Sequence, residues 1–160
     1  MAKYTIDEIA YDCDGSRIGI VAARFNQEIV DTLLDSALTT LSAHGIDDKA
    51  ISVVRVPGAF EIPLAAQRLA KTARLDAVIL LGTVIRGETP HFDFVAGQCA
   101  HGATRVGLDC DIPVIFGLLT TDTLDQAWAR AGGDHGNKGH EAALAALEMI
   151  TVLRNIGVDG

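Results

Sequence analysis

The hydrophobic residues of this 160-residue chain follow two alternating periods. Short, nearly continuous apolar runs, which are typical of strands buried on both faces, recur four times. These runs cover residues 17–22, 50–56, 77–81 and 114–119. The segments between and after the runs place apolar residues three and four positions apart, which is the spacing of one buried helical face. The pattern therefore predicts strands that alternate with amphipathic helices.

Residues that favour helix ends set the limits of the expected helices. The expected starts are Asn26, Pro63, Thr89 as the cap followed by Pro90, Thr121 or Asp122, and Asn137. Glycine favours the C-terminal end, so Gly45 should end the first helix and Gly132-Gly133 the fourth. We expect the third helix to reach about Leu108 and the last to reach about Ile156.

Strands and helices in alternation form a parallel sheet covered by helices on both faces. We therefore expect a flavodoxin-like α/β fold, a three-layer αβα sandwich with a four-stranded parallel sheet. Residues 1–15 have no clear period and end in turn-forming residues, so they should form an N-terminal arm, which could add an edge strand. Residues 16–160 should form a single domain, in keeping with their length.

The overall composition argues against several classes of protein. A net charge of −8 at pH 7 argues against a nucleic-acid partner, because such proteins present a basic surface. No apolar run has the length of a membrane span, and the first residues lack the apolar core of a signal peptide. We therefore expect a cytoplasmic protein with no membrane partner. Cys13, Cys99 and Cys110 are odd in number and form no C-x-x-C pair, which favours reduced and mostly buried thiols.

Ligands of parallel α/β sheets bind beyond the carboxyl ends of the strands. After the run at residues 77–81 come Gly87, Thr89 and Pro90, followed by His91 at the expected start of a helix. Backbone N–H groups at a helix start bind phosphate and other anions. The positive helix end also favours a neutral imidazole, which can accept a proton near pH 7. The alternative is a helix start whose histidine is only solvated.

Four further residues allow both a functional and a structural interpretation. Phe25 is either a hydrophobic staple or a platform for a flat ligand, and the staple is the safer interpretation. Glu61 can favour a helix start or accept hydrogen bonds from ligand hydroxyls. Arg130 is favoured near a helix C-terminus without any ligand. Lys138 opposes the dipole in the first turn of its helix, which indicates a nearby anion from the protein or from a substrate.

Common catalytic and metal-binding motifs are missing from the sequence. The glycines of residues 82–87 do not form G-x-G-x-x-G, the segment Gly-Asn-Lys-Gly lacks the hydroxyl residue of a P-loop, and no serine lies in G-x-S-x-G. His91 and Asp93 are two residues apart and His135 and His140 are five apart, so neither pair is spaced to hold a metal on one helix face. No metal site is expected.

Several motifs, in order and at characteristic spacing, resemble the lumazine synthase family of riboflavin biosynthesis. They are Arg24-Phe25-Asn26, Val56-Pro57-Gly58-Ala59-Phe60-Glu61-Ile62-Pro63, residues 81–95 (LGTVIRGETPHFDFV), Phe116-Gly117-Leu118-Leu119-Thr120-Thr121 and Asn137-Lys138-Gly139. The resemblance covers the chain from about residue 16 to the end. It implies condensation of 5-amino-6-(D-ribitylamino)uracil with 3,4-dihydroxy-2-butanone 4-phosphate. The products would be 6,7-dimethyl-8-ribityllumazine, phosphate and water, and no metal or organic cofactor is implied.

The resemblance also assigns roles to residues of this chain. Phe25 would stack on the pyrimidine, the adjacent Asn26 would also belong to the substrate-binding site, and His91 would move protons. The ribityl pocket would be lined by Gly58, Ala59, Phe60 and Glu61. Backbone contacts to the heterocycle would come from Thr83, Val84 and Ile85. The phosphate would be held by Gly87, Glu88, Thr89 and Arg130, while Lys138 would lie beside the anionic intermediate. Glu88 stands where family members can carry alanine or glutamine, so its side chain should point into solvent.

The resemblance further implies that the protein is a homo-oligomer with active sites between subunits. Phe116 falls inside the fourth strand, and in the family the equivalent aromatic residue comes from the neighbouring subunit of a pentamer. The segment 132–136 shows no insertion of the kind expected in members that remain pentamers, which favours a sixty-subunit icosahedral capsid. Two alternatives remain on the same fold. One is a non-catalytic flavin- or lumazine-binding protein or capsid scaffold, and the other is a phosphosugar-binding protein of another pathway.

Overall fold

Four parallel strands form the central sheet of the protein. A computed structural model describes residues 10–156, and within it the strands are β1 (Ile18–Ala23), β2 (Ile51–Val56), β3 (Ala77–Ile85) and β4 (Val114–Thr121). Their order across the sheet is β2-β1-β3-β4, and every neighbouring pair is parallel. The longest strand, β3, therefore lies inside the sheet, while β2 and β4 form its edges. The expected four-stranded parallel sheet is confirmed.

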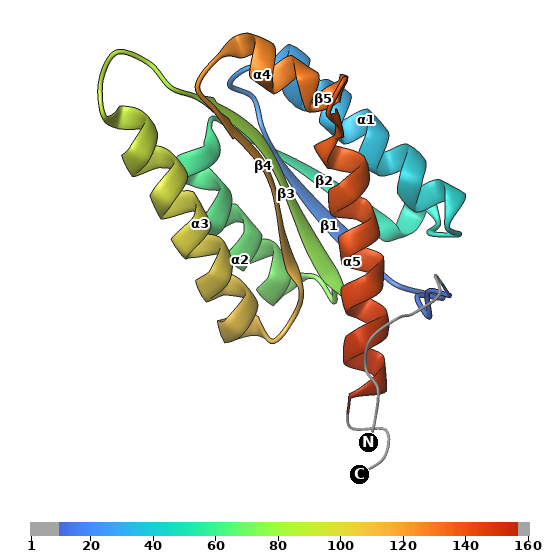
Figure 1. Cartoon of the computed structure of the whole chain (residues 1–160). Coiled ribbons are helices and arrows are strands. Elements are labelled where there is room, and N and C mark those ends of the chain that lie inside the picture. Colours follow the sequence, from blue (N-terminus) through green and yellow to red (C-terminus); the bar gives the residue numbers. More distant parts are fainter. Residues whose placement is uncertain (1–9, 157–160) are drawn as a thin grey trace.

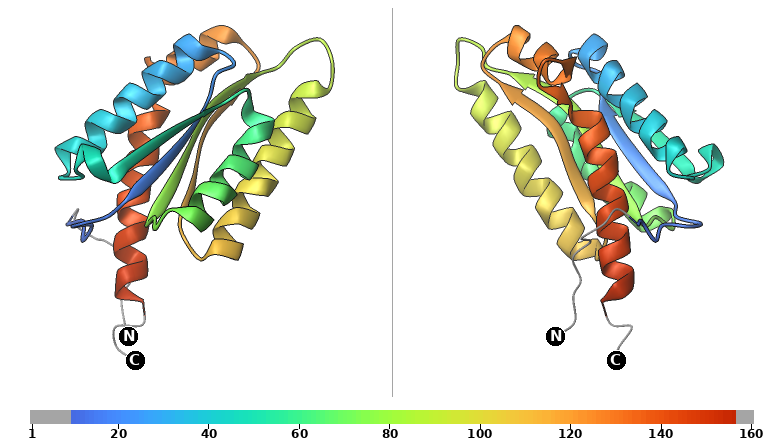
Figure 2. Two further views of the ribbon diagram at one scale, coloured as in Figure 1. Left: turned by 180° about the vertical axis from the view of Figure 1, so that it is seen from behind. Right: turned by 45° about the vertical axis from the view of Figure 1, so that its right-hand side comes forward.

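Helices cover both faces of this sheet, which confirms the three-layer αβα sandwich (Figure 1). One layer contains α1 (Gln27–Ala43), α4 (Leu124–Ala129) and α5 (Lys138–Asn155), and the other contains α2 (Ile62–Thr72) and α3 (His91–Cys110). Figure 2 shows the same two layers from behind and from one side. Short elements complete the chain: the 3-10 turns Asp48–Ala50 and Ala59–Glu61, and the small hairpin of β5 (Ala131–Gly133) and β6 (Gly136–Asn137).

Each layer has its own hydrophobic core because successive side chains of a strand point to opposite faces. Along β3, Ile79 and Leu81 pack in the core under α1 and α5, whereas Val78 and Leu80 pack in the core under α2 and α3. All four side chains are fully buried. The apolar run of β3 is continuous because each of its two faces is covered by a layer of helices.

The strands β3 and β4 extend further than their apolar runs predicted. Residues 83–85 were expected in a loop, but they continue β3, and the ladder to β4 includes the pairs Thr83↔Leu119 and Ile85↔Thr121. Threonine, valine and isoleucine are all β-branched and favour extended backbone, so a glycine at position 82 does not stop the strand. The loop before α3 is accordingly reduced to residues 86–90.

Three of the predicted helix starts need correction. The helix α3 begins at His91, with Pro90 rather than Thr89 at the cap position, although the Thr89 hydroxyl lies 3.4 Å from the backbone nitrogen of His91. The cap of α4 is Thr123, not Thr121 or Asp122, and Thr123 forms a reciprocal capping box with Gln126. Sequence alone could not separate three consecutive polar residues that are all good caps.

The third correction concerns Asn26, which lies at the start of α1 but does not cap it through its side chain. Its backbone is left-handed, with φ of 58°, and its side-chain nitrogen donates to the carbonyl oxygen of Thr83 at 3.0 Å. Asparagine tolerates this conformation better than most residues. The predicted cap Asn137 is confirmed, because its side-chain oxygen accepts from the backbone nitrogens of Gly139 at 2.8 Å and His140 at 3.3 Å. Gly45 follows α1 with φ of 85°, as expected of a terminating glycine.

The start of the described chain is fastened to α5. The backbone nitrogen of Asp12 donates to the hydroxyl of Thr151 at 2.9 Å, and the Arg154 guanidinium donates to the carbonyl oxygen of Asp12 at 3.1 Å and to the hydroxyl of Ser16 at 3.0 Å. Residues 10–16 form no strand. The predicted arm of residues 1–15 lies partly outside the described residues, since residues 1–9 are not described.

The three cysteines are free thiols, as expected, and Cys13 and Cys99 are buried. Burial raises the pKa of the Cys99 thiol to about 12. Within residues 10–156, no group of three or more metal-ligating side chains occurs. No helix of the described chain has the length and apolar character needed to cross a membrane.

Candidate functional site

A cavity of about 660 Å³ opens at the carboxyl ends of the inner strands, beside the start of α3. Its lining includes most of the residues expected in a binding site: Phe25, Gly58, Ala59, Phe60, Glu61, Thr83, Val84, Ile85, Gly87, Thr89 and His91. Pro57, Phe92, Phe94 and Val95 complete it. We call this cavity the strand-end cavity. Its volume suits a small organic ligand.

Backbone hydrogen bonds fix the loops that form the cavity. After β1, the nitrogen of Arg24 donates to the carbonyl oxygen of Val56 at 2.8 Å, and that of Phe25 donates to Pro57 at 3.0 Å. These bonds join the loop that carries Phe25 to the loop that begins the Ala59–Glu61 turn. The bond from Asn26 to Thr83 ties the same loop to β3. Asn26 does not itself line the cavity, so its contribution is to place Phe25 against β3.

Aromatic side chains around the cavity are unusually exposed. Phe25 is 72 % exposed, Phe60 is 58 % exposed and Phe94 is 67 % exposed. A hydrophobic staple would bury Phe25 against its helix, so the staple interpretation is wrong. Large apolar surfaces that gather around one cavity are typical of ligand and protein interfaces. The exposure of Phe25 therefore favours the platform interpretation.

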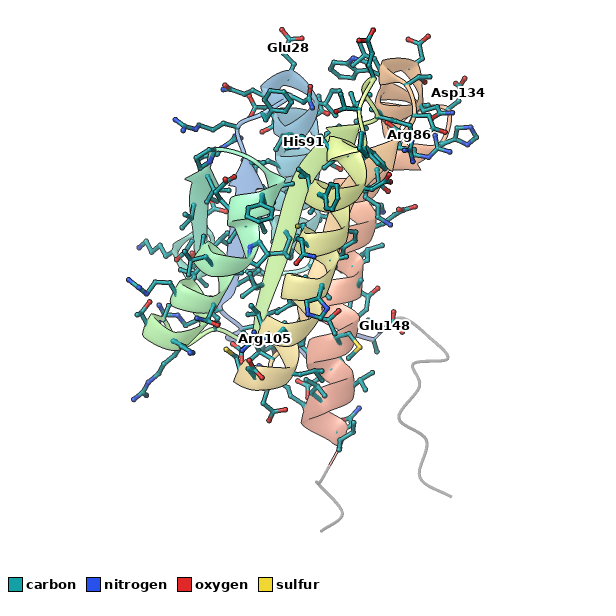
Figure 3. The ribbon with its side chains drawn as sticks, turned by 90° about the vertical axis from the view of Figure 1, so that its left-hand side faces the viewer. Glu28, Arg86, His91, Arg105, Asp134 and Glu148 are labelled. Atoms are coloured by element: carbon teal, nitrogen blue, oxygen red, sulfur yellow. The ribbon has the colours of Figure 1, made fainter. Side chains whose placement is uncertain are left out.

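Polar groups in the cavity are few. Glu61 ends the short turn before α2, and the hydroxyl of Thr83 is buried without a hydrogen-bond partner in the described chain. His91 opens α3 and faces the cavity, and Figure 3 shows it at the end of the molecule that also carries Arg86. An apolar cavity with a few well-placed polar groups is the usual composition of a small-molecule site.

The loop of residues 86–90 provides the expected anion-binding features at one side of the cavity. Gly87 and Thr89 line the cavity, whereas the exposed Glu88 does not, in agreement with a side chain directed into solvent. Within the described chain, the backbone nitrogens of Gly87 and Glu88 donate to no protein acceptor. Free N–H groups beside a helix start can bind an anion. Thr89 adds a hydroxyl that can donate to the same anion.

Sequence reasoning missed a group of side chains that holds this loop in place. Arg86 donates from Nε to Asp122 Oδ1 at 2.9 Å, and its Nη1 lies 3.5 Å from Asp93 Oδ1. Its guanidinium carbon also lies 4.4 Å from the centre of the Phe92 ring. We call Arg86 with these three partners the Arg86 clamp. The hydrogen bond to Asp122 is the main reason that the pKa of Arg86 is raised.

A second, smaller cavity of about 300 Å³ lies beside β4 and the start of α5. It is lined by Leu118, Leu119, Thr120, Arg130, His135, Lys138 and Glu141. We call it the cationic pocket. Lys138 Nζ lies 3.7 Å from Glu141 Oε2, so a carboxylate of the protein already offsets part of the unfavourable placement of this lysine in the first turn of α5. Arg130 Nη1 donates to the carbonyl oxygen of Gln126 at 3.0 Å, and within residues 10–156 its other side-chain donors have no protein acceptor.

The β5-β6 hairpin brings the two cations of this pocket together. The backbone nitrogen of Lys138 donates to the carbonyl oxygen of Arg130 at 2.9 Å, and the backbone nitrogen of His135 donates to Ala129 at 2.8 Å. The sequence predicted that Gly132 and Gly133 end the fourth helix, but α4 already ends at Ala129 and the two glycines belong to β5. The hairpin itself was not predicted. The hairpin also adds His135 to the pocket, a residue that the sequence suggested only as a poor metal ligand.

Most of the predicted site residues thus fall into two places in one chain. The strand-end cavity and the cationic pocket share no lining residue, so Arg130 and Lys138 do not meet His91 within the same cavity. Phe116 lines neither. It is the third residue of β4, pairs with Leu80 and packs against the core under α2 and α3. Because β4 is an edge strand, the cationic pocket lies at an edge of the sheet.

The fold and the strand-end cavity define an α/β protein with a cavity suited to a small ligand at the carboxyl ends of a parallel sheet, where the loop of residues 86–90 and His91 lie at one side. Comparison with known families gives the particular family. Residues 15–154 match the model described as 6,7-dimethyl-8-ribityllumazine synthase. The chain belongs to this family, in agreement with the resemblance of its sequence motifs.

Proposed function

We propose that this protein condenses 5-amino-6-(D-ribitylamino)uracil with 3,4-dihydroxy-2-butanone 4-phosphate to form 6,7-dimethyl-8-ribityllumazine, with release of phosphate and water. The observation that carries the proposal is the strand-end cavity, which combines an aromatic platform, a carboxylate, an anion-binding loop and a histidine. Each substrate has a matching feature. One substrate is a flat heterocycle with a polyhydroxyl chain, and the other carries a phosphate.

The pyrimidine substrate fits the apolar side of the cavity. Its ring would stack on the exposed face of Phe25, and backbone groups of Thr83, Val84 and Ile85 would meet its polar edge. The ribityl chain would extend past Gly58, Ala59 and Phe60, with its hydroxyls donating to Glu61. Gly58 suits this position because a side chain there would lie 3.3 Å from Glu61 Oε2 and crowd the carboxylate.

The phosphate substrate fits the loop before α3. Its phosphate would accept hydrogen bonds from the N–H groups of Gly87 and Glu88 and from the Thr89 hydroxyl. This position leaves the four-carbon chain beside His91 and the pyrimidine. No metal or organic cofactor has a part in the proposal, because the reaction needs only proton transfers and the loss of phosphate and water.

His91 would move protons between the reacting groups. Attack of a pyrimidine amine on the ketone forms a carbinolamine, and loss of water gives an imine. Removal of a carbon-bound proton then allows the phosphate to leave, and the second amine closes the ring with loss of another water. The His91 imidazole, which faces the cavity, is placed to accept and return these protons.

We further propose that the cationic pocket of one subunit completes the strand-end cavity of its neighbour. Arg130 would then reach the phosphate, Lys138 would lie beside the anionic intermediate, and Phe116 would close the pyrimidine side. The separation of the two cavities in one chain and the position of the cationic pocket at an edge strand support this proposal. A head-to-tail contact of this kind closes into a ring when its rotation permits.

The ring would be a pentamer, and the short β5-β6 hairpin favours its assembly into a sixty-subunit capsid. Only Asp134 and His135 separate the two strands of this hairpin, so the segment carries no insertion. Residues 16–160 would act as a single domain in each subunit. Sedimentation of the purified protein distinguishes a pentamer from a capsid in one experiment.

The proposed reaction can be tested directly with the purified protein. Both substrates are mixed with it, and the absorbance and fluorescence of the lumazine product are followed over time. We expect product formation well above the spontaneous background. A rate equal to that background would refute the proposed function and favour a non-catalytic lumazine- or flavin-binding protein.

Substitution of His91 by alanine should slow product formation without abolishing it. We expect a loss of roughly ten- to a hundredfold in kcat, because orientation of two reactants supplies much of the acceleration even without a proton carrier. The matched control is His101→Ala, which removes an exposed histidine of the same helix that does not line the cavity. Equal rates for the His91 variant and the wild type would remove its assigned role.

A further inference from the structure

The Arg86 clamp connects three elements that surround the loop of residues 86–90. Arg86 itself follows β3, Phe92 and Asp93 lie in the first turn of α3, and Asp122 lies between β4 and α4. The backbone of Arg86 is also fixed, since its nitrogen donates to the carbonyl oxygen of Thr121 at 2.9 Å. One guanidinium therefore ties both ends of a five-residue loop to the rest of the fold.

The clamp also contains both positive and negative charges beside the loop of residues 86–90. Asp93 and Asp122 are two carboxylates paired with Arg86, the residue directly before Gly87, and each would repel a phosphate bound by this loop. Arg86 is the cation that pairs with both. Its donors to Asp122 and Asp93 are engaged, and its guanidinium lies over Phe92, so the side chain is committed to the protein and is not an open anion ligand.

We propose that Arg86 is a positioning residue for phosphate binding: it holds the loop of residues 86–90 open toward the strand-end cavity and neutralises the two carboxylates beside it. The inference rests on the proposed function, because it assumes that this loop binds the phosphate of a substrate. It predicts an effect on phosphate binding that is largely separate from the binding of the pyrimidine, since neither Arg86 nor its two carboxylate partners line the strand-end cavity.

The test compares Arg86→Met with Arg105→Met, a matched control. Arg105 is paired with Asp109 at 3.4 Å on the same helix, and Figure 3 shows it far from Arg86, toward the other end of α3. Inorganic phosphate is titrated into each protein by calorimetry, and the lumazine product is titrated separately as a probe of the pyrimidine pocket. Kinetic constants for both substrates are measured on the same preparations.

For Arg86→Met we expect the phosphate affinity to fall about fivefold and the KM of the phosphate substrate to rise about fivefold. The reason is the loss of the positive charge that offsets the two carboxylates at this exposed site. Binding of the lumazine and the KM of the pyrimidine should change less than about twofold. Adding Asp93→Asn and Asp122→Asn to Arg86→Met should recover much of the phosphate affinity, because the repelling charges are then absent as well. Arg105→Met should behave as wild type.

Several results would overturn the inference. They are unchanged phosphate affinity in Arg86→Met, equal losses for phosphate and lumazine, no recovery in the triple variant, or a wild-type protein that binds no phosphate. The phosphate titration does not depend on catalysis. If the wild type makes no lumazine but Arg86→Met still loses phosphate affinity selectively, the proposed function fails and the role of Arg86 stands.

Discussion

Replacement of Gly139 by alanine should strongly destabilise the protein. Gly139 is buried in the first turn of α5, where this helix meets α1. A side-chain carbon at this position would press on the carbonyl oxygen of Leu33 and lie 2.7 Å from the carbonyl carbon of the same residue. Both atoms belong to the backbone of α1, so no rotation of a side chain can relieve the clash.

The cost should be about 3 kcal/mol, the upper part of the range for overpacking in a core. It is measured as the free energy of unfolding in urea at one fixed protein concentration, because assembly also contributes to stability. Lys138 precedes Gly139 directly, so displacement of the α5 start should also lower activity. The expected result is a large loss in both measurements.

The control is Gly97→Ala, in the exposed face of α3, where an added side-chain carbon meets no atom within 4 Å. Alanine favours a helix over glycine, so this variant should be as stable as the wild type or more stable by up to about 1 kcal/mol. If Gly139→Ala unfolds at the same urea concentration as Gly97→Ala, the close approach of α1 and α5 is not as described.

Arg130→Ala should impair use of the phosphate substrate far more than use of the pyrimidine. Only the phosphate requires a cation, and a lost charge-assisted hydrogen bond costs about 1.5–3 kcal/mol, or roughly ten- to a hundredfold in kcat/KM. The only hydrogen bond that the Arg130 side chain makes within the described chain is to Gln126, on its own helix. Stability should therefore change by no more than about 0.5 kcal/mol.

The kinetic constants are measured for each substrate at saturating concentrations of the other, with Arg130→Lys as a second variant. Lysine keeps the charge but loses the planar donor fork, so it should recover part of the activity. Equal losses for the two substrates, together with a lower free energy of unfolding, would show that Arg130 has a structural role.

The apolar runs were sufficient to predict the sheet but not the full length of its strands. Ile79 and Leu80 belong to a strand buried on both faces, so hydrophobicity alone marks them. Thr83, Val84 and Ile85 belong to the same strand because β4 continues beside them, and this partner is 36 residues away in the sequence. Local pattern does not reveal the register of a distant neighbour.

In the candidate site, too, the features that follow from local pattern could be predicted, and those that depend on distant partners could not. Phe25, Glu61 and His91 follow strand ends, and parallel topology brings strand ends together, so their meeting in one cavity could be predicted. The Arg86 clamp could not, because Arg86 and Asp122 are brought together only by the β3-β4 ladder. Likewise, Arg130, His135 and Lys138 form a pocket through a hairpin of two very short strands, which leaves no hydrophobic pattern.

In the proposed assembly, the strand-end cavity of one subunit and the cationic pocket of its neighbour form one catalytic site. Co-expression of the His91→Ala and Arg130→Ala variants in equal amounts, with purification of the mixed assemblies, tests this claim. In a head-to-tail ring, about one site in four would combine an intact His91 with an intact Arg130 from the adjacent subunit. We predict lumazine formation near a quarter of the wild-type rate, well above either variant alone. Activity equal to the average of the two variants would contradict the claim, because it would show that both residues must come from the same chain.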